Sequence, residues 1–160
     1  MNFRIGHGFD LHRLQSGGKL MLGGILISND ISPIAHSDGD IVIHAIVDAL
    51  CGALGSGDIG QHFPDSDPAH KNASSTMFLE KLKRDIDAAG YAVGNVDVTI
   101  LAERPRLGAF KQQIATNLSR LLGGPVNVKA GTNEGCDAIG RGEAIAAYAV
   151  VLLAKRAGNP

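Results

Sequence analysis

The segment that most restricts the fold of this chain is the apolar stretch from Glu143 to Leu153. It is rich in alanine, valine, isoleucine and leucine, and it lacks the polar alternation of a half-exposed strand. Such a stretch is typical of a strand that is buried on both faces. It therefore predicts either a central strand of a sheet or a strand that packs against another subunit.

Helical and strand patterns alternate along the rest of the chain. Strands are predicted at 3–9, 20–22, 25–27, 96–102 and 126–130, and helices at 41–53, 74–89 and 108–122. The segment from Asp58 to Lys71 has two prolines and no period, which predicts a mobile loop. The order of elements predicts a single α+β domain over residues 1–160, with a mixed β-sheet and helices packed on one face.

Composition and charge narrow the class of protein. The chain has 160 residues, of which 44% are hydrophobic and 19% charged, as in a compact globular protein. Its net charge is -1 and no run of Lys or Arg resembles the basic footprint that nucleic acid or anionic lipid would require, so we expect neither a nucleic acid nor a membrane as partner. Two cysteines are too few for a disulfide framework, and no signal segment opens the chain, so we expect a cytoplasmic protein.

Asp10, His12 and His44 are the residues that best indicate a chemistry. Residues two apart in a strand point to the same face, so Asp10 and His12, at the end of the first strand, can bind one ion while Leu11 faces the core. His44 lies in the first turns of the following helix and can complete the set. One carboxylate and two imidazoles are typical of catalytic zinc, which keeps a fourth position open.

The second ring nitrogen of His44 is expected to bind a carboxylate on the same helix. Asp40 and Asp48 each lie one turn away, and such a partner fixes the tautomer of a ligating histidine. We favour Asp48. The alternative interpretation of the whole group is that Asp10 and His12 cap a strand and that His44 is a polar residue near the surface.

Five motifs carry a resemblance to a known family. In chain order they are G-H-G-F-D-L-H at 6–12, A-H-S-D-G-D at 35–40, D-I-G-Q-H-F-P-D-S-D-P at 58–68, G-N-V-D-V-T-I at 94–100 and G-R-G-E at 140–143. With them, essentially the entire chain resembles the 2-C-methyl-D-erythritol 2,4-cyclodiphosphate synthase family of non-mevalonate isoprenoid biosynthesis. The resemblance implies a homotrimer with sheets facing the three-fold axis and active sites between adjacent subunits.

The resemblance also implies a phosphorus-oxygen lyase reaction that closes a ring. The 2-phosphate of 4-diphosphocytidyl-2-C-methyl-D-erythritol 2-phosphate attacks the β-phosphorus of its own diphosphate, which releases CMP and the 2,4-cyclodiphosphate. Intramolecular attack requires positioning and charge neutralisation rather than an activated nucleophile. Zn²⁺, or another divalent transition metal, would bind Asp10, His12 and His44, and Mg²⁺ or Mn²⁺ would bridge the diphosphate on Glu134.

Two residues, His36 and Thr132, are implied to be catalytic because they stabilise charge in the transition state. His36 and Ser37 lie just before a helix start, where free backbone N–H groups favour phosphate. Simple capping of that helix by residues 37–40 is the alternative role, and the two are compatible.

Four loops are implied to hold the rest of the substrate. Asp58 and Gly60 would bind the methylerythritol hydroxyls under a flap at 63–67. Residues 102–108 would bind cytosine, and residues 131–134 would bind the diphosphate. The alternatives are solvated turns and ordinary connections. The implied substrate-binding residues are Asp10, Leu11, His12, His36, Ser37, Asp58, Ile59, Gly60, Phe63, Pro64, Asp65, Ser66, Asp67, Ala102, Glu103, Arg104, Pro105, Arg106, Leu107, Gly108, Gly131, Thr132, Asn133, Glu134, Ala138 and Arg141.

The chain departs from the family pattern at a few positions. Gly131 and Asn133 stand where many relatives have threonines, Ala138 replaces an aromatic residue, and Tyr148 occupies a position that is often acidic. Ala138 and Tyr148 bear on the trimer-axis cavity that binds isoprenoid diphosphates in some relatives, and whether this chain has that site stays open.

Two other classes of function use part of the same sequence. A zinc-dependent phosphoesterase would have the same ligands and a metal-bound water, and would give no cyclic product. A non-catalytic isoprenoid-binding module would bind lipid diphosphates without releasing CMP. The presence of Asp10, His12, His44 and Thr132 together argues against the second alternative.

Overall fold

A computed structural model of the chain describes residues 2–64, 66–70 and 73–156. Its strands are β1 (Phe3–Ser16), β2 (Leu20–Leu22), β3 (Ile25–Ser28), β4 (Ile31–Pro33), β5 (Tyr91–Leu101), β6 (Val126–Gly131) and β7 (Ala144–Lys155). Its helices are α1 (Ile41–Leu54), α2 (Ile59–His62), the 3-10 helix η1 (Pro68–His70), α3 (Ser75–Ala88), α4 (Lys111–Leu122) and α5 (Asp137–Gly140).

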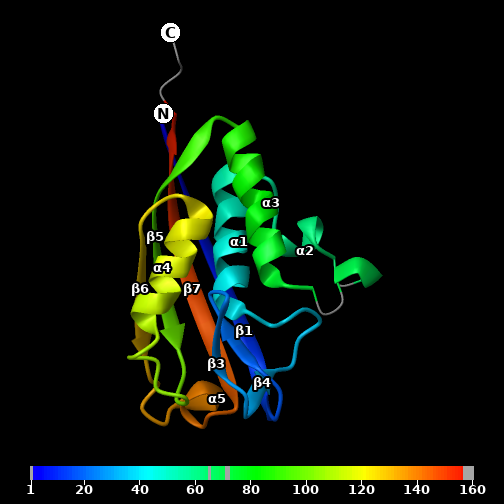
Figure 1. Cartoon of the computed structure of the whole chain (residues 1–160), viewed down its shortest axis with the longest axis vertical. Helices are drawn as coiled ribbons and strands as arrows, with labels where there is room; N and C mark the ends of the chain where they lie inside the picture. Colours follow the sequence, from blue (N-terminus) through cyan, green and yellow to red (C-terminus); the bar gives the residue numbers. More distant parts are fainter. Residues whose placement is uncertain (1, 65, 71–72, 157–160) are drawn as a thin grey trace.

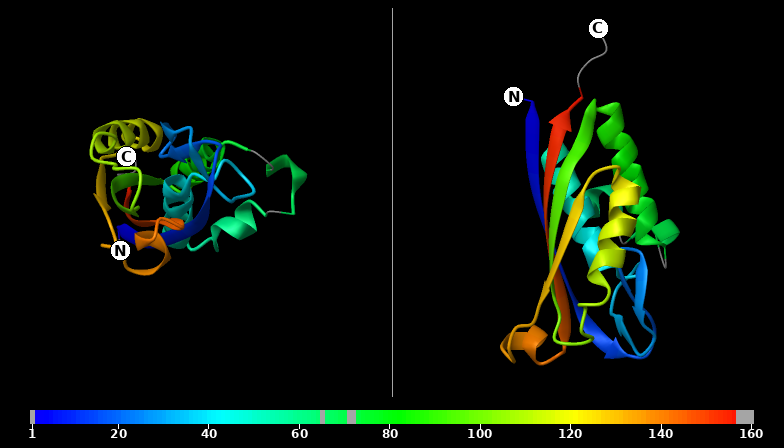
Figure 2. Two further views of the ribbon diagram at one scale, coloured as in Figure 1. Left: turned by 90° about the horizontal axis from the view of Figure 1, so that it is seen from below. Right: turned by 60° about the vertical axis from the view of Figure 1, so that its left-hand side comes forward.

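Five of these strands form one twisted sheet in the order β4-β1-β7-β5-β6 (Figure 1). β5 and β6 run parallel and the other neighbours antiparallel, so the sheet is mixed, as predicted. β2 and β3 form a separate hairpin. The helices α1, α3 and α4 cover one face of the large sheet (Figure 2). The predicted α+β architecture is therefore confirmed.

β7 lies at the centre of the sheet, but it is buried on both faces only over its first part. The residues from Ala144 to Ala147 are all buried, whereas Tyr148 and Val150 are 39% and 44% exposed. The short helix α5 accounts for the difference, because its Ile139 packs against Ala144 and Ala146 in a small apolar cluster on the face away from α1. Beyond that cluster the face is open.

β1 extends to Ser16, so the prediction of a short first strand at 3–9, with Asp10 and His12 at its end, is wrong about its length. Pairing with β7 continues from Phe3 to Arg13, and pairing with β4 then covers Leu14 to Ser16. The neighbouring strands pair with the backbone N–H and C=O groups of this polar segment. Local sequence preference does not predict such pairing. Asp10 and His12 therefore lie within a long, rigid strand.

α1 packs unusually close to β1, because two glycines face it. A Cβ atom at Gly6 would lie 1.7 Å from the carbonyl oxygen of Ala49, and one at Gly8 would lie 2.0 Å from that of Ala45. Any other residue would push the helix away from the strand. The glycines of the first motif therefore set the distance between His44 on α1 and the strand that carries Asp10 and His12.

The start of α1 is fixed by Asp40, a fully buried carboxylate. Its Oδ1 accepts hydrogen bonds from the backbone N–H groups of Ile43, at 3.1 Å, and Gly23, at 2.8 Å, and its Oδ2 accepts one from Gly24, at 2.7 Å. Burial raises the pKa of Asp40, although these N–H groups favour its ionised form. One side chain thus caps α1 and ties the β2–β3 turn to it.

The sheet face away from α1, here called the open face, carries exposed apolar side chains. Phe3, Ile5, Phe9 and Leu11 lie on this face of β1, and the ring of Tyr148 is tilted against that of Phe9 with 4.8 Å between centroids. Leu11 is 45% exposed, so the prediction that it faces the core is wrong. The helices cover the other face, which is the one that Asp10 and His12 share.

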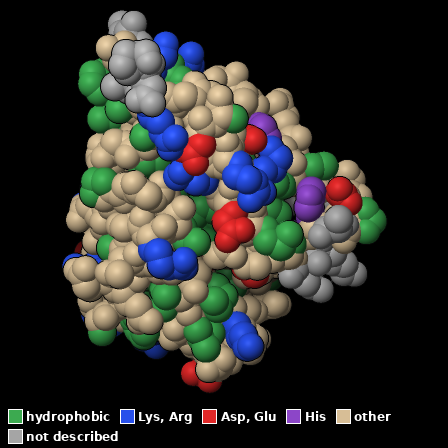
Figure 3. Space-filling model, turned by 45° about the horizontal axis from the view of Figure 1, so that its top comes forward, with side chains coloured by type: hydrophobic (Ala, Val, Ile, Leu, Met, Phe, Trp, Pro, Cys, Tyr) green, Lys and Arg blue, Asp and Glu red, His purple; other side chains and the backbone are tan. Residues whose placement is uncertain are grey.

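The outer side of α3 is polar. Lys81 pairs with Asp85 at 2.7 Å and Lys83 with Asp87 at 2.5 Å. Basic and acidic side chains are interspersed on the face of the molecule shown in Figure 3. Ion pairs at the protein surface contribute little to stability. No helix in the described part of the chain has the length and apolar character needed to cross a bilayer.

Candidate active site and metal centre

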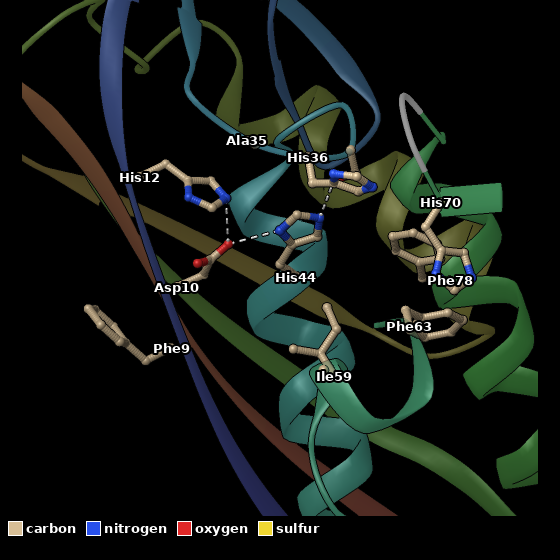
Figure 4. A pocket seen from close by; sticks show the side chains of 12 residues that line it. Phe9, Asp10, His12, Ala35, His36, His44, Ile59, Phe63, His70 and Phe78 are labelled. Atoms are coloured by element: carbon tan, nitrogen blue, oxygen red, sulfur yellow. Dashed lines mark hydrogen bonds and ion pairs between the residues drawn. The ribbon is translucent and has the colours of Figure 1, made fainter. Parts of the chain in front are cut away.

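β1 and α1 bring Asp10, His12 and His44 together (Figure 4). Oδ2 of Asp10 lies 3.3 Å from Nε2 of His12 and 2.9 Å from Nδ1 of His44. One donor atom from each residue lies within 4.8 Å of the other two. The sequence-predicted ligands therefore converge on one point, although they come from a strand and a helix.

The donor set fits a divalent metal ion. Two imidazole nitrogens and one carboxylate oxygen suit zinc and neighbouring transition metals, and three protein ligands leave room for a fourth ligand. All three side chains are partly buried beside a cavity, which limits competition from bulk water. Among the described residues, this is the one cluster of three His, Cys, Asp or Glu side chains with metal-binding geometry.

The ring of His44 is polarised by its carboxylate neighbour. Burial alone would lower the pKa of His44, but the hydrogen bond and the negative charge of Asp10 outweigh it, so the pKa is raised. A metal ion at Nδ1 would take the place of the proton that faces Asp10.

The second nitrogen of His44 binds two serines rather than a carboxylate. Nε2 lies 3.1 Å from Oγ of Ser37 and 2.9 Å from Oγ of Ser75. The prediction of Asp48 or Asp40 as its partner is wrong. Nε2 points towards the start of α3, while Asp48 accepts a hydrogen bond from the backbone of Ile59 at 3.3 Å and Asp40 caps α1.

Ser75 is a residue that the sequence did not indicate. It opens α3, is fully buried and lies 31 positions from His44 in the chain. Its Oγ donates to Oδ1 of Asp38, and its backbone N–H donates to Oδ2 of Asp38 at 2.9 Å. A serine at a helix start is typical of a cap. Its contact with the His44 ring depends on the packing of α3 against α1, which the sequence does not show.

A cavity of about 260 Å³ opens beside the three ligands. Its wall includes five further residues that were predicted to bind substrate, namely His36, Ser37, Ile59, Gly60 and Phe63. Nε2 of His36 is buried and has no hydrogen-bond partner among the described residues. Such an atom is a ready donor or acceptor for a ligand in the cavity.

The segment predicted as a mobile loop after α1 contains α2 and η1 and is anchored on α3. Phe63 stacks on Phe78 with 4.2 Å between ring centroids, and His70 meets both rings edge-on. Asp58 caps α2 by accepting from the backbone N–H of Gln61 at 2.9 Å. These helical turns are too short to produce a period in the sequence. Asp65 of the predicted flap lies outside the described residues, while Pro64, Ser66 and Asp67 connect α2 to η1.

A second cavity, of about 550 Å³, brings together the predicted cytosine and diphosphate segments. Its lining residues are Ala102, Arg106, Leu107, Gly108, Lys111, Ala130, Gly131, Thr132 and Glu134. Oγ1 of Thr132 donates to Oε1 of Glu134 at 2.9 Å. Glu134 has a left-handed backbone conformation, with φ of 51°, which is uncommon for a non-glycine residue and often occurs at functional sites.

Six more predicted residues lie outside the lining of both cavities. Glu103, Arg104 and Pro105 line an adjoining hollow, Asn133 donates to Asp137 at 2.9 Å, and Arg141 pairs with Glu143 at 3.0 Å. Ala138 packs against the small cluster at the end of β7. The two cavities of one chain share no lining residue, so a single chain does not bring the metal ligands and Thr132 to the same place.

Comparison with known proteins agrees with this arrangement. Residues 3–154 match the YgbB family. The chloroplastic 2-C-methyl-D-erythritol 2,4-cyclodiphosphate synthase of Arabidopsis thaliana is 52% identical over 157 residues, covering 96% of this chain and 68% of the plant protein. The synthase of Geotalea daltonii is 50% identical over 96% of this chain and 91% of its own length.

A solved structure has the same fold. The CDP complex of IspF from Plasmodium falciparum superposes with a TM-score of 0.86 at 36% identity, covering 98% of each chain. This likeness therefore extends over nearly the whole chain. From the match along residues 3–154 and from relatives of this similarity, the chain belongs to the YgbB family.

Proposed function

We propose that this chain is a 2-C-methyl-D-erythritol 2,4-cyclodiphosphate synthase, which converts 4-diphosphocytidyl-2-C-methyl-D-erythritol 2-phosphate to the 2,4-cyclodiphosphate and CMP. The observation that carries the proposal is the convergence of Asp10, His12 and His44 beside a cavity in a chain that is 52% identical to a synthase of that name. In the reaction, an oxygen of the 2-phosphate bonds to the β-phosphorus while the bond to CMP breaks.

The first cavity is proposed to hold the reacting phosphates and the methylerythritol unit. Zn²⁺ bound by Asp10, His12 and His44 would supply Lewis-acid polarisation of the β-phosphate. His36 has a buried, unpartnered Nε2 on the cavity wall, which supports a role as hydrogen-bond donor to a phosphate oxygen. Ser37 lies beside it, before the start of α1, where backbone N–H groups favour anions.

The second cavity is proposed to hold the cytidine diphosphate end of the substrate. The relative from Plasmodium falciparum binds CDP, which supports a nucleotide site in this fold. The backbone of 102–108 would read the cytosine, and Thr132 would donate to the diphosphate. Glu134 would bind Mg²⁺ or Mn²⁺, because a carboxylate oxygen suits a hard cation.

A homotrimer with sheets facing a three-fold axis is proposed because one chain holds its two cavities apart. In the trimer, the metal ligands of one subunit would meet Thr132 of the next. The exposed Phe3, Ile5, Phe9 and Val150 on the open face support association of sheets, since contiguous apolar surface of this kind marks interfaces.

Two further properties remain proposals from the sequence. We propose that residues 1–160 form one synthase domain, which the match over residues 3–154 supports. A cytoplasmic location is also proposed, although the named relatives include chloroplastic plant proteins.

The test of this function is incubation of the purified protein with the cytidine diphosphate substrate, followed by phosphorus NMR. We expect equal amounts of CMP and cyclic diphosphate, and loss of both after metal removal by a chelator. Hydrolysis to a linear product would instead favour a phosphoesterase, and binding without release of CMP would favour a non-catalytic module.

A further inference from the structure

We propose that Asp38 and Ser75 form a positioning pair that commits the His44 ring to metal binding through Nδ1. The inference rests on the proposed metal role of His44 and concerns residues that do not line the cavity. It is carried by the direction of the hydrogen bonds that connect the loop before α1, the start of α3 and the metal centre.

The hydrogen bonds run in one direction. Asp38 accepts two bonds from Ser75, one from the hydroxyl to Oδ1 and one from the backbone N–H to Oδ2 at 2.9 Å. A serine hydroxyl has a single hydrogen, and a carboxylate can only accept it. Towards Nε2 of His44, at 2.9 Å, the Ser75 oxygen must therefore accept.

This direction determines the tautomer of His44. If Ser75 accepts, Nε2 must carry a hydrogen, so the hydrogen that a metal ion would displace is the one on Nδ1, which faces Asp10. The neutral ring then has its lone pair on Nδ1. Nδ1 is the nitrogen that faces Oδ2 of Asp10, at 2.9 Å, where the ligand atoms converge. The pair thus keeps Nδ1 available to a metal ion and keeps Nε2 hydrogen-bonded to Ser75, away from the ion.

Ser75 is better suited to this role than Ser37, which also contacts Nε2. Ser37 lies on the cavity wall and is only partly buried, so its hydroxyl is available to a bound phosphate. Ser75 is fully buried and is absent from the wall. Its bond to His44 is therefore independent of substrate.

Asp38 is itself fixed on both sides. Its Oδ1 accepts from the backbone N–H of Asp40 at 3.2 Å, and its own N–H donates to the carbonyl of Ala73 at 3.2 Å. The pair therefore ties the metal centre to the docking of α3 on the loop before α1. Loss of a hydrogen-bond partner behind a metal ligand typically lowers metal affinity about 10- to 100-fold. We expect an effect of that size for this pair.

The test measures zinc affinity by competition with a chromophoric chelator, without substrate. Ser75→Ala should weaken zinc binding about 10- to 100-fold, because the ring loses the acceptor that fixes it. Asp38→Asn should weaken it at least as much. Its amide would donate to the Ser75 oxygen and free the hydroxyl hydrogen to face Nε2, which favours the opposite tautomer.

Ser74→Ala is the matched control. Ser74 is the adjacent serine at the same helix start, its side chain contacts Thr76 at 2.7 Å, and it makes no bond to the α3 backbone through that side chain. We expect its zinc affinity to stay within about threefold of the wild type, well below the effect of losing a partner of a metal ligand. Circular dichroism and thermal unfolding of each variant report whether the fold is intact.

A second readout distinguishes positioning from general damage. In the zinc-loaded wild type, the Nε2–H of His44 should give a slowly exchanging imidazole resonance in proton NMR, and Ser75→Ala should lose it. Unchanged zinc affinity in folded Ser75→Ala, or in folded Asp38→Asn if the first variant does not fold, would overturn the inference alone. A wild type that binds no zinc would overturn the proposed metal site together with it.

Discussion

Gly8 on β1 lies so close to Ala45 on α1 that a Cβ atom at Gly8 would fall 2.0 Å from the carbonyl oxygen of Ala45. Ala45 follows His44, and Gly8 precedes Asp10 by two positions on the same side of the strand. The contact that packs the core is therefore also the contact that places the imidazole of the helix over the carboxylate of the strand.

Substitution Gly8→Ala should reduce the free energy of unfolding by at least about 2 kcal/mol, because the added methyl meets backbone that cannot move without displacing α1. Denaturant unfolding measures the change. Gly108→Ala is the control, since nothing lies within 4 Å of the position that its methyl group would occupy. Equal stability of the two variants would contradict this account of the strand and helix contact.

Removal of a metal ligand should abolish turnover without unfolding the protein. We expect Asp10→Asn and His44→Ala to lower kcat at least about 100-fold, since Lewis-acid stabilisation is worth several kcal/mol. Light scattering should give the same molar mass for variants and wild type. Wild-type turnover by either variant in a metal-buffered assay would show that the cluster does not serve the reaction.

Thr132→Ala should lower kcat more than it raises KM. A hydrogen bond to charge that develops in the transition state affects kcat, and loss of one such donor costs about 100-fold or more in favourable sites. Steady-state kinetics with the cytidine diphosphate substrate separate the two constants. An increase in KM at constant kcat would assign Thr132 to ground-state binding instead.

Cys51 should resist thiol reagents in the folded protein. Burial, together with the charge of Asp48, raises the pKa of its thiol to about 11, so the reactive thiolate forms only as the pH approaches that value. In a Cys136→Ser variant, which keeps Cys51 as the one thiol, we expect no modification at pH 8 in buffer and complete modification in denaturant. Rapid reaction of the native variant would mean that α1 opens readily.

The sequence predicted the longer elements and the shared direction of Asp10 and His12, because both depend on local spacing. α1 shows a helical pattern between a capping Asp40 and Gly55, and in β6 the valines at 126 and 128 alternate with polar residues. Asp10 and His12 share a face in any extended strand. These features do not require knowledge of the partner element.

The errors all concern features that depend on packing between elements. Leu11 is exposed because the helices cover the opposite face of β1, and the length of β1 depends on β7 and β4. His44 binds Ser75 rather than Asp48 because its ring points across to α3 and away from the next turn of its own helix. The residue spacing within one helix cannot predict a contact with another helix.

The separation of the two cavities within one chain links chemistry to quaternary structure. On the proposed arrangement, a correctly folded protomer that has come apart from its neighbours keeps both half-sites and can complete neither. Dilution below the dissociation constant of the assembly would then silence the enzyme while its circular dichroism stayed native. Specific activity would become a direct measure of the assembled fraction.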